Sequence, residues 1–479
     1  MEQYTHDGLS FSISARVFDK PELQTIMGYQ FHMVVRKETV MLEHSLEAGR
    51  VTDGAGGAGM ARAEHPLHRW YLLGILLLIY IFGAVDRSVV SVIAEPLKHD
   101  FHLNDAQLGA LGGMAYSITF AAFVLPMGWL IDRVDRRVLL AASTAIWSLL
   151  TMCGAIAGNF AHLVLARMGV GAAESGASPA SVSLISDSFP LHQRNTAISI
   201  YYSGAPAGQL VIFVLGGWIL MHFEWQAVFL VAGVPGLVLA ALLFFTCREP
   251  VRGSQDLRAG PSAKSADAKA PPMREVLRTI VRDPALRFAM LGNMIVTGVN
   301  STLVLWLTSF LVRIHGLPVS RAAIWVGLGY GLSQTLAALA VGPFADRYSR
   351  SLSSRLARIP ATATLLALAA GTVMALTGSL TVALGALILF SFIGGFFNGP
   401  SYALVLSLAQ PRMRGSVMAA SKLLVILIGS GLFPFLTGAI SDAVGTENSI
   451  QPAILATMSL LAVASCCFVL AGRRARATE

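Results

Sequence analysis

The chain has 479 residues, of which 54% are hydrophobic and only 13% charged; soluble domains average about 25% charged residues, so an ordinary soluble protein is excluded. The net charge of +8 does not indicate nucleic-acid binding, because Arg and Lys lie in short loops between apolar runs, where they set membrane orientation. The four cysteines lie in or beside apolar runs without metal-ligand spacing, so we expect neither a disulfide framework nor a metal site.

The first segment, residues 1–69, differs in composition from everything that follows. It is mixed and weakly patterned, contains the glycine-rich stretch VTDGAGGAG, and has no signal-peptide arrangement. A second methionine, Met60, directly precedes a short basic lead into the first apolar run. We expect either a disordered cytoplasmic extension or a chain whose translation begins at Met60.

Twelve apolar segments of membrane-spanning length begin at Trp70. We predict a six-helix bundle over 70–246 and a second over 287–472, which gives an all-α polytopic membrane protein. The predicted spans are 70–94, 107–131, 138–157, 162–188, 195–221, 226–246, 287–313, 321–345, 357–377, 380–408, 415–440 and 449–471.

Basic residues gather on one side of this arrangement. That side holds Arg133, Arg194, the loop 347–358 and the basic tail 473–479, whereas the other has little beyond Lys98, Arg313 and Arg321. Because cytoplasmic loops carry the excess of Lys and Arg, we expect a multi-pass protein of the plasma (inner) membrane with both termini in the cytoplasm.

The connection between the bundles, 247–286, is expected to be a cytoplasmic linker. It starts with Gly, Ser, Ala and Pro, typical of a flexible chain, and ends in MREVLRTIVRD. In this last stretch an apolar helical stripe that includes Val276, Leu277 and Ile280 faces away from three arginines. We expect an interfacial helix on the inner leaflet, with a solvated linker helix as the alternative.

The fourth predicted span carries two charges within an apolar and small-residue segment, LVLARMGVGAAESGASPASVSLISDS. Arg167 and Glu174 are about two helical turns apart, so they project from the same side. A charge that faces lipid costs several kcal/mol, so both side chains should face protein or a wet cavity. A structural ion pair that only joins two helices is the alternative.

Two loop motifs repeat at the same place in each half. GWLIDRVDRR begins at Gly128 and is echoed by GPFADRYSR, which begins at Gly342. We interpret them as gating loops in which Gly128 permits close helix approach and the arginines donate to the other half in one access state. The expected gating residues are Gly128, Asp132, Arg133, Arg136, Arg137, Asp187, Asp346 and Arg347.

The GxxxDRxxRR spacing resembles the signature loop of the major facilitator superfamily, which is built from two parallel six-helix halves with the site between them. FGAVDRSVVSVIAEPLKHDFHLNDAQLGAL and LARMGVGAAESGASPASVSLISDSFP look like the spinster-like branch of that superfamily, from Trp70 onward. The resemblance implies an amphiphile carrier, with sphingolipid or lysophospholipid substrates in eukaryotic members. It also implies that Asp86, Arg87, Arg167 and Glu174 line the cavity.

The Asp86–Arg87 pair lies inside the first apolar run, more than a turn from either end. Adjacent residues point about 100° apart on a helix, so the two side chains need not address the same partner. We expect Asp86 to face the cavity as a proton carrier that, once protonated, releases an arginine for an anionic head group. A permanent salt bridge is the alternative.

Other polar residues in the spans are weaker candidates, each more typical of an interhelical hydrogen bond. The cavity candidates are Tyr116, Tyr201, Gln209, Asn293, Asn300, Trp306 and Asn398, with Tyr202, Thr297, Ser301, Thr302, Gln334 and Lys422 beside them. No phosphate-binding glycine loop is present in the sequence, so ATP is not expected to drive transport.

We therefore expect a monomeric secondary transporter, without cofactor, that moves an organic, anionic or amphiphilic small molecule by alternating access, with possible proton coupling. An uptake permease for small organic acids is the first alternative, and a non-transporting receptor on the same scaffold is the second. A membrane enzyme is not expected, because the sequence offers no paired acid and base or His-rich loop at the interface.

Overall fold

The structure is a computed structural model that describes residues 66–252, 273–349, 353–410, 413–446 and 448–476. Most of the expected extension 1–69, part of the linker and the end of the tail lie outside these residues. So do the side chains of Asp346, Arg347 and Asn398, although their backbones lie in helices.

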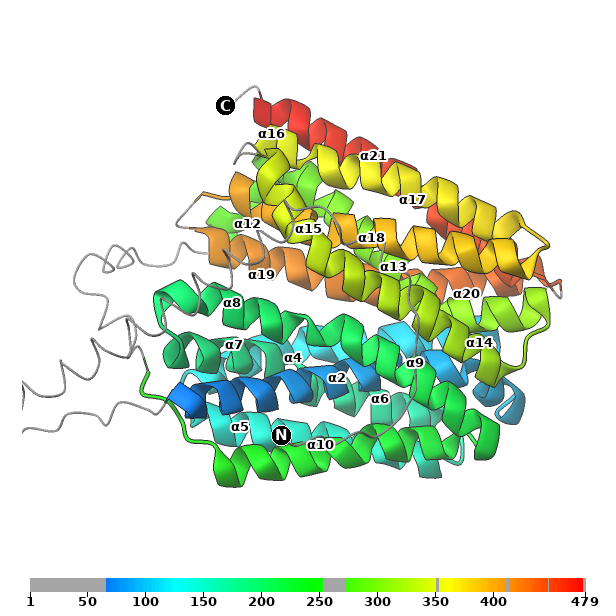
Figure 1. Ribbon diagram of the computed structural model, residues 1–479, viewed down its shortest axis with the longest axis horizontal. Helices are drawn as coiled ribbons and strands as arrows, with labels where there is room; N and C mark the ends of the chain where they lie inside the picture. Colours follow the sequence, from blue (N-terminus) through cyan, green and yellow to red (C-terminus); the bar gives the residue numbers. More distant parts are fainter. Residues whose placement is uncertain (1–65, 253–272, 350–352, 411–412, 447, 477–479) are drawn as a thin grey trace, which may run out of the picture. The chain divides into compact units, whose positions relative to one another are not determined.

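The first half is built from helices that run back and forth across the bundle (Figure 1). In chain order these are α2 (Pro66–Asp100), α3 (Asp105–Gly109), η1 (Ala110–Met114), α4 (Ala115–Ile131), α5 (Arg136–Cys153), η2 (Gly154–Ile156), α6 (Phe160–Glu174), α7 (Ala177–Ser188), α8 (Leu191–Tyr202), α9 (Gly204–His222) and α10 (Gln226–Thr246).

The second half repeats this pattern after the linker. Its elements are α12 (Met273–Arg282), α13 (Pro284–His315), α14 (Val319–Val326), η4 (Gly327–Leu332), α15 (Ser333–Ser349), α16 (Ser353–Leu356), α17 (Arg358–Leu376), α18 (Leu380–Leu408), α19 (Arg414–Leu424), η6 (Val425–Leu432), α20 (Phe433–Val444) and α21 (Ile450–Arg476). The described residues contain no strand. This all-helical build satisfies the backbone hydrogen bonds within each span, as a bilayer requires.

The twelve predicted spans each coincide with one helix or a run of helices, and ten of these runs in the described residues are long and apolar enough to cross a membrane. The other two, like several of the ten, are runs of shorter pieces. Span 162–188 is divided into α6 and α7 at Ser175 and Gly176, and span 321–345 is divided by the π-helical η4. The predicted all-α fold of twelve helices is consistent with this arrangement.

The packing faces of the helices are lined by small and branched residues. At Gly171 a Cβ would overlap with the backbone carbonyl of Tyr116, so α6 can approach α4 this closely only because the residue is glycine. Large apolar side chains such as Leu125, Leu165 and Phe245 lie exposed on the outer surface. This surface is the one that lipid chains would cover.

The two halves meet along three sets of helices. The segment α3–η1–α4 packs on η6 and α20, α9 packs on α14 and η4, and α2 touches α13. Three of these elements, η1, η4 and η6, are π-helical. Such wider turns commonly mark functional sites in helical proteins, and all three border the cavity described next.

The linker helix α12 forms where the amphipathic stretch predicts it. Val276 is fully buried against the bundle, whereas Leu277 and Val281 are exposed. This leaves apolar side chains free on the outer face, consistent with the expected position on the inner leaflet, which stays a prediction.

Candidate functional site

A cavity of about 970 Å³ lies between the two halves. Residues from α2, α4, α6, α8 and α9 line it on one side, and residues from α13, α15, α18 and α19 line it on the other. Most of the surface area of its wall is apolar, although Ser, Thr, Asn and Gln side chains are interspersed. Its charged lining residues are Arg87, Arg167, Glu174 and Lys422.

Arg87 and Glu174 form an ion pair at the cavity wall. The arginine side chain is 29% exposed and the glutamate only 6%. The Tyr116 hydroxyl donates a 2.9 Å hydrogen bond to the second carboxylate oxygen of Glu174, and the Arg87 guanidinium lies over the Tyr80 ring. A Cβ at Gly83 would come within 2.9 Å of Glu174 Oε1, so this glycine makes the room that the pair needs.

Asp86 and Arg167 form a second pair, which is more deeply buried. Arg167 Nη2 donates to Asp86 Oδ1 at 2.8 Å, and its Nη1 donates to the Asp86 carbonyl at 3.0 Å. The Thr151 hydroxyl of α5 donates to the same Oδ1 at 2.6 Å. Asp86 Oδ2 is buried without a hydrogen-bond partner in the structure.

The position of Asp86 differs from the expectation. Its side chain does not line the cavity, whereas those of Arg87, Arg167 and Glu174 do. Because adjacent residues on a helix point about 100° apart, Arg87 faces the cavity while Asp86 faces α5 and α6. The two acids thus pair separately, each with a different arginine.

The weaker candidates divide into two groups. Tyr116, Gln209 and Asn300 line the cavity, together with Tyr202, Thr297, Ser301 and Gln334. Asn293, Trp306 and Tyr201 lie instead in interhelical hydrogen bonds or ring contacts, Thr302 is buried without a hydrogen-bond partner among the described residues, and the side chain of Asn398 is outside the described part. Asn293 accepts from the Ser401 hydroxyl, Trp306 donates to the Pro434 carbonyl, and Tyr201 stacks on Tyr80.

Lys422 places a cationic side chain on the cavity wall from α19. Among the residues that the structure describes, none makes a hydrogen bond or an ion pair with it. Arg87 and Arg167 have carboxylate partners, whereas Lys422 has none among the described residues, so the described lining carries an excess of positive charge.

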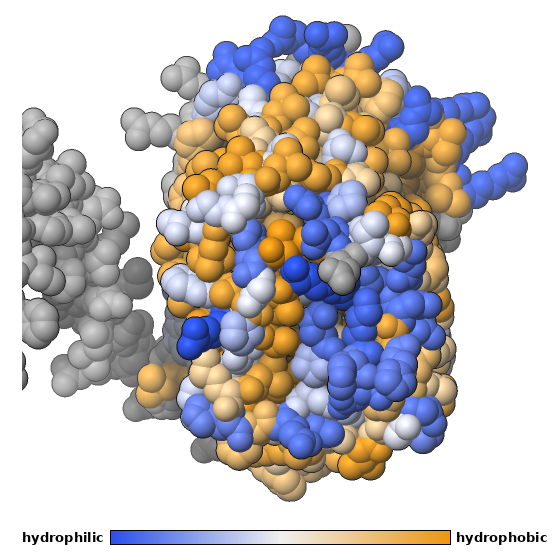
Figure 2. Space-filling view, turned by 90° about the vertical axis from the view of Figure 1, so that its right-hand side faces the viewer, coloured by the Kyte–Doolittle hydropathy of each residue, from blue (hydrophilic) through white to orange (hydrophobic). Residues whose placement is uncertain are grey.

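One end of the molecule is closed by an ionic cluster that joins the two halves. Arg313 of α13 contacts Glu95 of α2 at 2.8 Å and Asp105 of α3 at 2.7 Å. Asp105 also accepts from Lys98 and from the Ser441 hydroxyl of α20. Because the basic loops are expected at the opposite, cytoplasmic end, we call Glu95, Lys98, Asp105, Arg313 and Ser441 the outer latch. Figure 2 looks at this end and shows hydrophilic residues among hydrophobic ones across it.

Close backbone packing accompanies the latch. Asp442 accepts from the backbone N–H groups of Asp105 and Ala106, at 2.9 and 2.8 Å, in the first turn of α3. A carboxylate there interacts favourably with the positive end of the helix dipole. A Cβ at Gly438 would overlap with the Asp105 carbonyl, so the halves can touch only with glycine at this position.

At the opposite end, the predicted gating loop is organised around Arg136. This buried arginine donates to Asp187 of α7 at 2.5 Å, to the Ser183 hydroxyl at 2.6 Å and to Glu249 beyond α10 at 2.6 Å. Glu249 also accepts from the Arg137 backbone N–H. Asp187 was expected as a partner of this loop, and the structure brings the two together.

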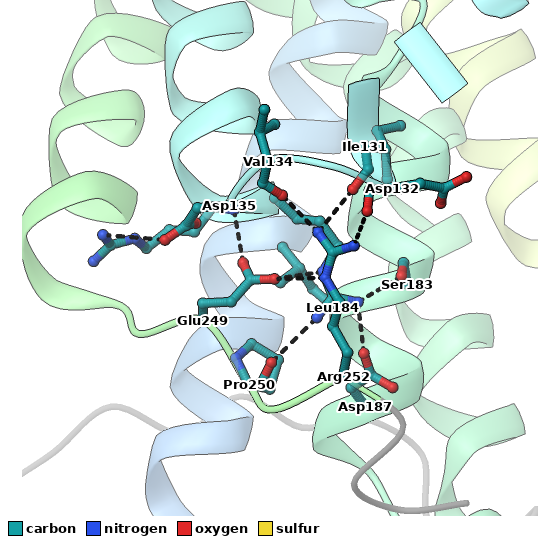
Figure 3. Close-up of polar contacts among 12 residues, drawn as sticks. Ile131, Asp132, Val134, Asp135, Ser183, Leu184, Asp187, Glu249, Pro250 and Arg252 are labelled. Atoms are coloured by element: carbon teal, nitrogen blue, oxygen red, sulfur yellow. Dashed lines mark hydrogen bonds and ion pairs between the residues drawn. The ribbon is translucent and has the colours of Figure 1, made fainter. Parts of the chain in front are cut away.

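Arg252 holds the turn between α4 and α5. Its guanidinium donates to the backbone carbonyls of Ile131, Asp132 and Val134, while the Asp132 carboxylate points away from this cluster (Figure 3). Arg133 folds back on its own helix, over the Trp129 ring.

The expectation that these arginines donate to the other half is not met in this conformation, since the partners shown for Arg133, Arg136 and Arg137 belong to the first half. The expected close helix approach at Gly128 is not seen in this conformation and stays a prediction for another access state. No described atom lies within 4 Å of the Cβ position at Gly128, so no helix approaches it closely here.

Comparison with known proteins identifies the architecture. The sequence profile of the Major Facilitator Superfamily matches residues 76–434. The chain belongs to this superfamily. It is therefore a membrane transporter of the secondary type and not an enzyme, and spinster proteins are among the members that it resembles.

Three similar proteins match most of the chain in sequence or in structure. An MFS-type efflux pump of Mycolicibacterium smegmatis is 26% identical over 86% of this chain and 94% of its own length. Protein spinster homolog 1 of Rattus norvegicus is 28% identical over 84% of this chain and 78% of its own. The crystal structure of a bacterial homologue of the human lysosomal transporter Spinster, inward-facing and unoccupied, superposes with a TM-score of 0.77 at 26% identity and covers 87% of this chain and 99% of its own.

The sequence did not point to three residues that contact the two ion pairs of the first half. Thr151 binds Asp86, Tyr80 lies against Arg87, and Gly83 makes room for Glu174. A lone threonine in an apolar span gives no signal of its own. Gly83 and Tyr80 lie one turn and two turns before Arg87, a helical spacing that places them on the same face.

Proposed function

We propose that this transporter carries an organic anion with an apolar body. Lys422 carries the proposal, because it is a cation on the cavity wall without a carboxylate partner among the described residues. An anionic group beside Lys422 would accept a charge-assisted hydrogen bond that no described residue accepts from it. The mostly apolar wall suits the remainder of an amphiphile.

We further propose that transport is coupled to protons through the two ion pairs. If Glu174 takes up a proton, Arg87 loses its carboxylate partner and becomes free, beside Lys422, to bind the substrate anion. Asp86 serves as the second proton site, since one oxygen of its buried carboxylate has no partner. Both the substrate anion and the proton would thus favour the state in which Arg87 and Glu174 are separated. Their binding is therefore coupled.

We infer an inward-facing conformation in a plasma membrane, with both termini in the cytoplasm. Three observations support this orientation. Basic loops lie at the end that is not closed by the outer latch, the latch joins the halves at the opposite end, and the similar spinster-type structure is inward-facing. The monomer remains our expectation for the working unit.

Binding and transport measured on one purified protein test the proposal. A single-chain lysophospholipid anion, its zwitterionic counterpart and a small sugar acid are offered in turn. The anionic amphiphile is expected to bind best, and Lys422→Gln should weaken its binding by roughly tenfold, the loss of one charge-assisted hydrogen bond. Arg321→Gln is the matched control, because Arg321 is exposed and outside the cavity.

The other outcomes separate the alternatives. Preference for the sugar acid would favour an uptake permease for organic acids. Binding without movement of label across a vesicle membrane would favour a receptor. Equal binding of anionic and zwitterionic amphiphiles, unchanged in Lys422→Gln, would refute the assigned role of Lys422.

A further inference from the structure

A second cleft, of about 270 Å³, lies where α16, the start of α17 and the end of α21 meet. It shares no lining residue with the cavity between the halves. Its walls are Ser354, Ala357, Arg358, Ala361, Phe468, Val469, Gly472, Arg473 and Arg476. Figure 1 shows α16 beside the last turns of α21, close to the C-terminus.

Three guanidinium groups border this cleft, and no carboxylate is among its described lining residues. Arg358, Arg473 and Arg476 are exposed, and none forms an ion pair within the part of the chain that the structure describes. Arg473 and Arg476 are three residues apart, so they project from the same face of α21. The chain thus holds three like charges around a small space.

The position of Arg358 increases this positive potential. It is the first residue of α17, where the helix dipole is positive and favours an anion over a cation. Arg473 and Arg476, in contrast, lie in the last turn of α21, where cations are favoured by the dipole. A bound anion would relieve the unfavourable arrangement at Arg358.

The floor of the cleft is apolar. Phe468 is fully buried there and Ala357 and Ala361 are nearly so, and a Cβ at Gly472 would come within 2.9 Å of Ala357 Cβ. The helices are therefore packed tightly beneath the three guanidinium groups. A ligand that fits this cleft combines an anionic head with an apolar part that continues along the helices.

We propose that this cleft binds the phosphate head group of an anionic phospholipid in the inner leaflet. Basic pockets between membrane helices on the cytoplasmic side bind such head groups, and arginine binds phosphate through two parallel hydrogen bonds. The site is distinct from the transport cavity, and only the choice of leaflet rests on the proposed orientation. A bound lipid bridges the start of α17 and the end of α21.

The test uses the full chain purified in detergent and titrated with phosphatidylglycerol, phosphatidylcholine or inorganic phosphate. Native mass spectrometry counts the lipid molecules retained, and the thermal unfolding midpoint is measured on the same samples. Phosphatidylglycerol is expected to be retained and to raise the midpoint, whereas phosphatidylcholine is not. Each arginine changed to Gln, at Arg358, Arg473 or Arg476, should weaken phosphatidylglycerol binding by roughly fivefold.

Arg474→Gln is the matched control. Arg474 lies on the same last turn of α21 and is exposed, but it does not line the cleft. Its loss should leave binding unchanged. An equal loss in Arg474→Gln would indicate diffuse attraction to a basic surface and overturn the site.

Two further results would overturn the proposal. One is wild-type affinity for phosphatidylglycerol in the triple Gln variant. The other is complete displacement of the lipid by millimolar inorganic phosphate, which would indicate a site for free phosphate. If the triple variant does not fold, the single variants and the triple Lys variant, which keeps charge but not bidentate geometry, give the same comparison.

Discussion

The two ion pairs of the first half differ in their surroundings, although both join α2 to α6. Arg167 and Asp86 are 4% and 2% exposed, whereas Arg87 is 29% exposed and meets Glu174 at the cavity wall. A buried pair is costly to break, because the remaining charge has no water to solvate it. A pair at a wet wall is easier to exchange for a ligand. The sequence placed all four charges in the interior but did not distinguish these roles.

Substitution of the two arginines should therefore give different results. Arg167→Ala leaves Asp86 buried with only Thr151 as a partner, so it should destabilise the protein by about 3–5 kcal/mol. Arg87→Ala should cost less stability, because Glu174 keeps its bond from Tyr116, but it should weaken binding of an anionic substrate. Thermal unfolding and equilibrium binding of both variants measure the two effects.

The double variant Asp86→Ala/Arg167→Ala is the control for the stability loss expected in Arg167→Ala. Removing both partners should restore part of the stability lost in Arg167→Ala, since no unpaired charge remains. Equal stability losses in the Arg87 and Arg167 single variants would contradict the difference in roles.

Sequence periodicity predicted the helices well and their irregularities poorly. Runs such as LVLAALLFF identify α10 by apolar length alone. The break at Ser175–Gly176 and the π-helical turns of η1, η4 and η6 depend on how glycine-rich segments meet another helix. In η1, for example, a Cβ at Gly113 would come within 2.7 Å of the Gly431 carbonyl in η6. Such a contact joins residues that are far apart in the chain, so no local pattern predicts it.

Gly438→Ala tests the packing of α20 on α3. The added methyl group would overlap with the Asp105 carbonyl only while the outer end is closed. Overpacking of this kind costs about 1–3 kcal/mol, so the population should shift roughly 5–150-fold away from the closed outer end. The shift can be measured by electron paramagnetic resonance as the distance between spin labels attached to cysteines at Glu224 and Val444. The exposed native cysteines Cys153 and Cys466 are replaced first. Gly74→Ala is the control, since no described atom lies within 4 Å of its Cβ position.

Gly128→Leu tests the opposite end. Open space surrounds Gly128 in this conformation, so the larger side chain should leave thermal stability nearly unchanged. If α4 packs closely on the other half when the inner end closes, the same side chain will block that closure and reduce the transport rate while substrate binding from the inner side persists. A variant that transports at the normal rate would exclude a close approach at Gly128.

At the scale of the whole molecule, the two ends of the bundle are stabilised differently. The outer latch joins α2 and α3 to α13 and α20, so its bonds must break for the outer end to open. The cluster of Arg136, Asp187 and Glu249 lies within the first half, so it can persist while the halves move. Alternating access in this protein thus needs the outer latch to be balanced by contacts that form at the inner end. We expect such contacts to involve the second gating loop, which carries the repeated motif at Asp346.

Arg313→Gln should shift this balance towards an open outer end. The substitution removes the charge that binds both Glu95 and Asp105 and leaves Asp105 with Lys98 and Ser441. Losing charge-assisted bonds of this kind costs about 1.5–3 kcal/mol, which changes the ratio of the two access states by roughly 10–150-fold. The same spin-label distance across the outer end should lengthen, and labelling of a cysteine placed at Ser301, in the cavity, by a membrane-impermeant reagent added outside should increase. Arg321→Gln, which removes an exposed charge at the same end, should change neither measurement. An unchanged outer distance in Arg313→Gln, with a folded protein, would show that close packing at Gly438 rather than the ionic latch keeps this end closed.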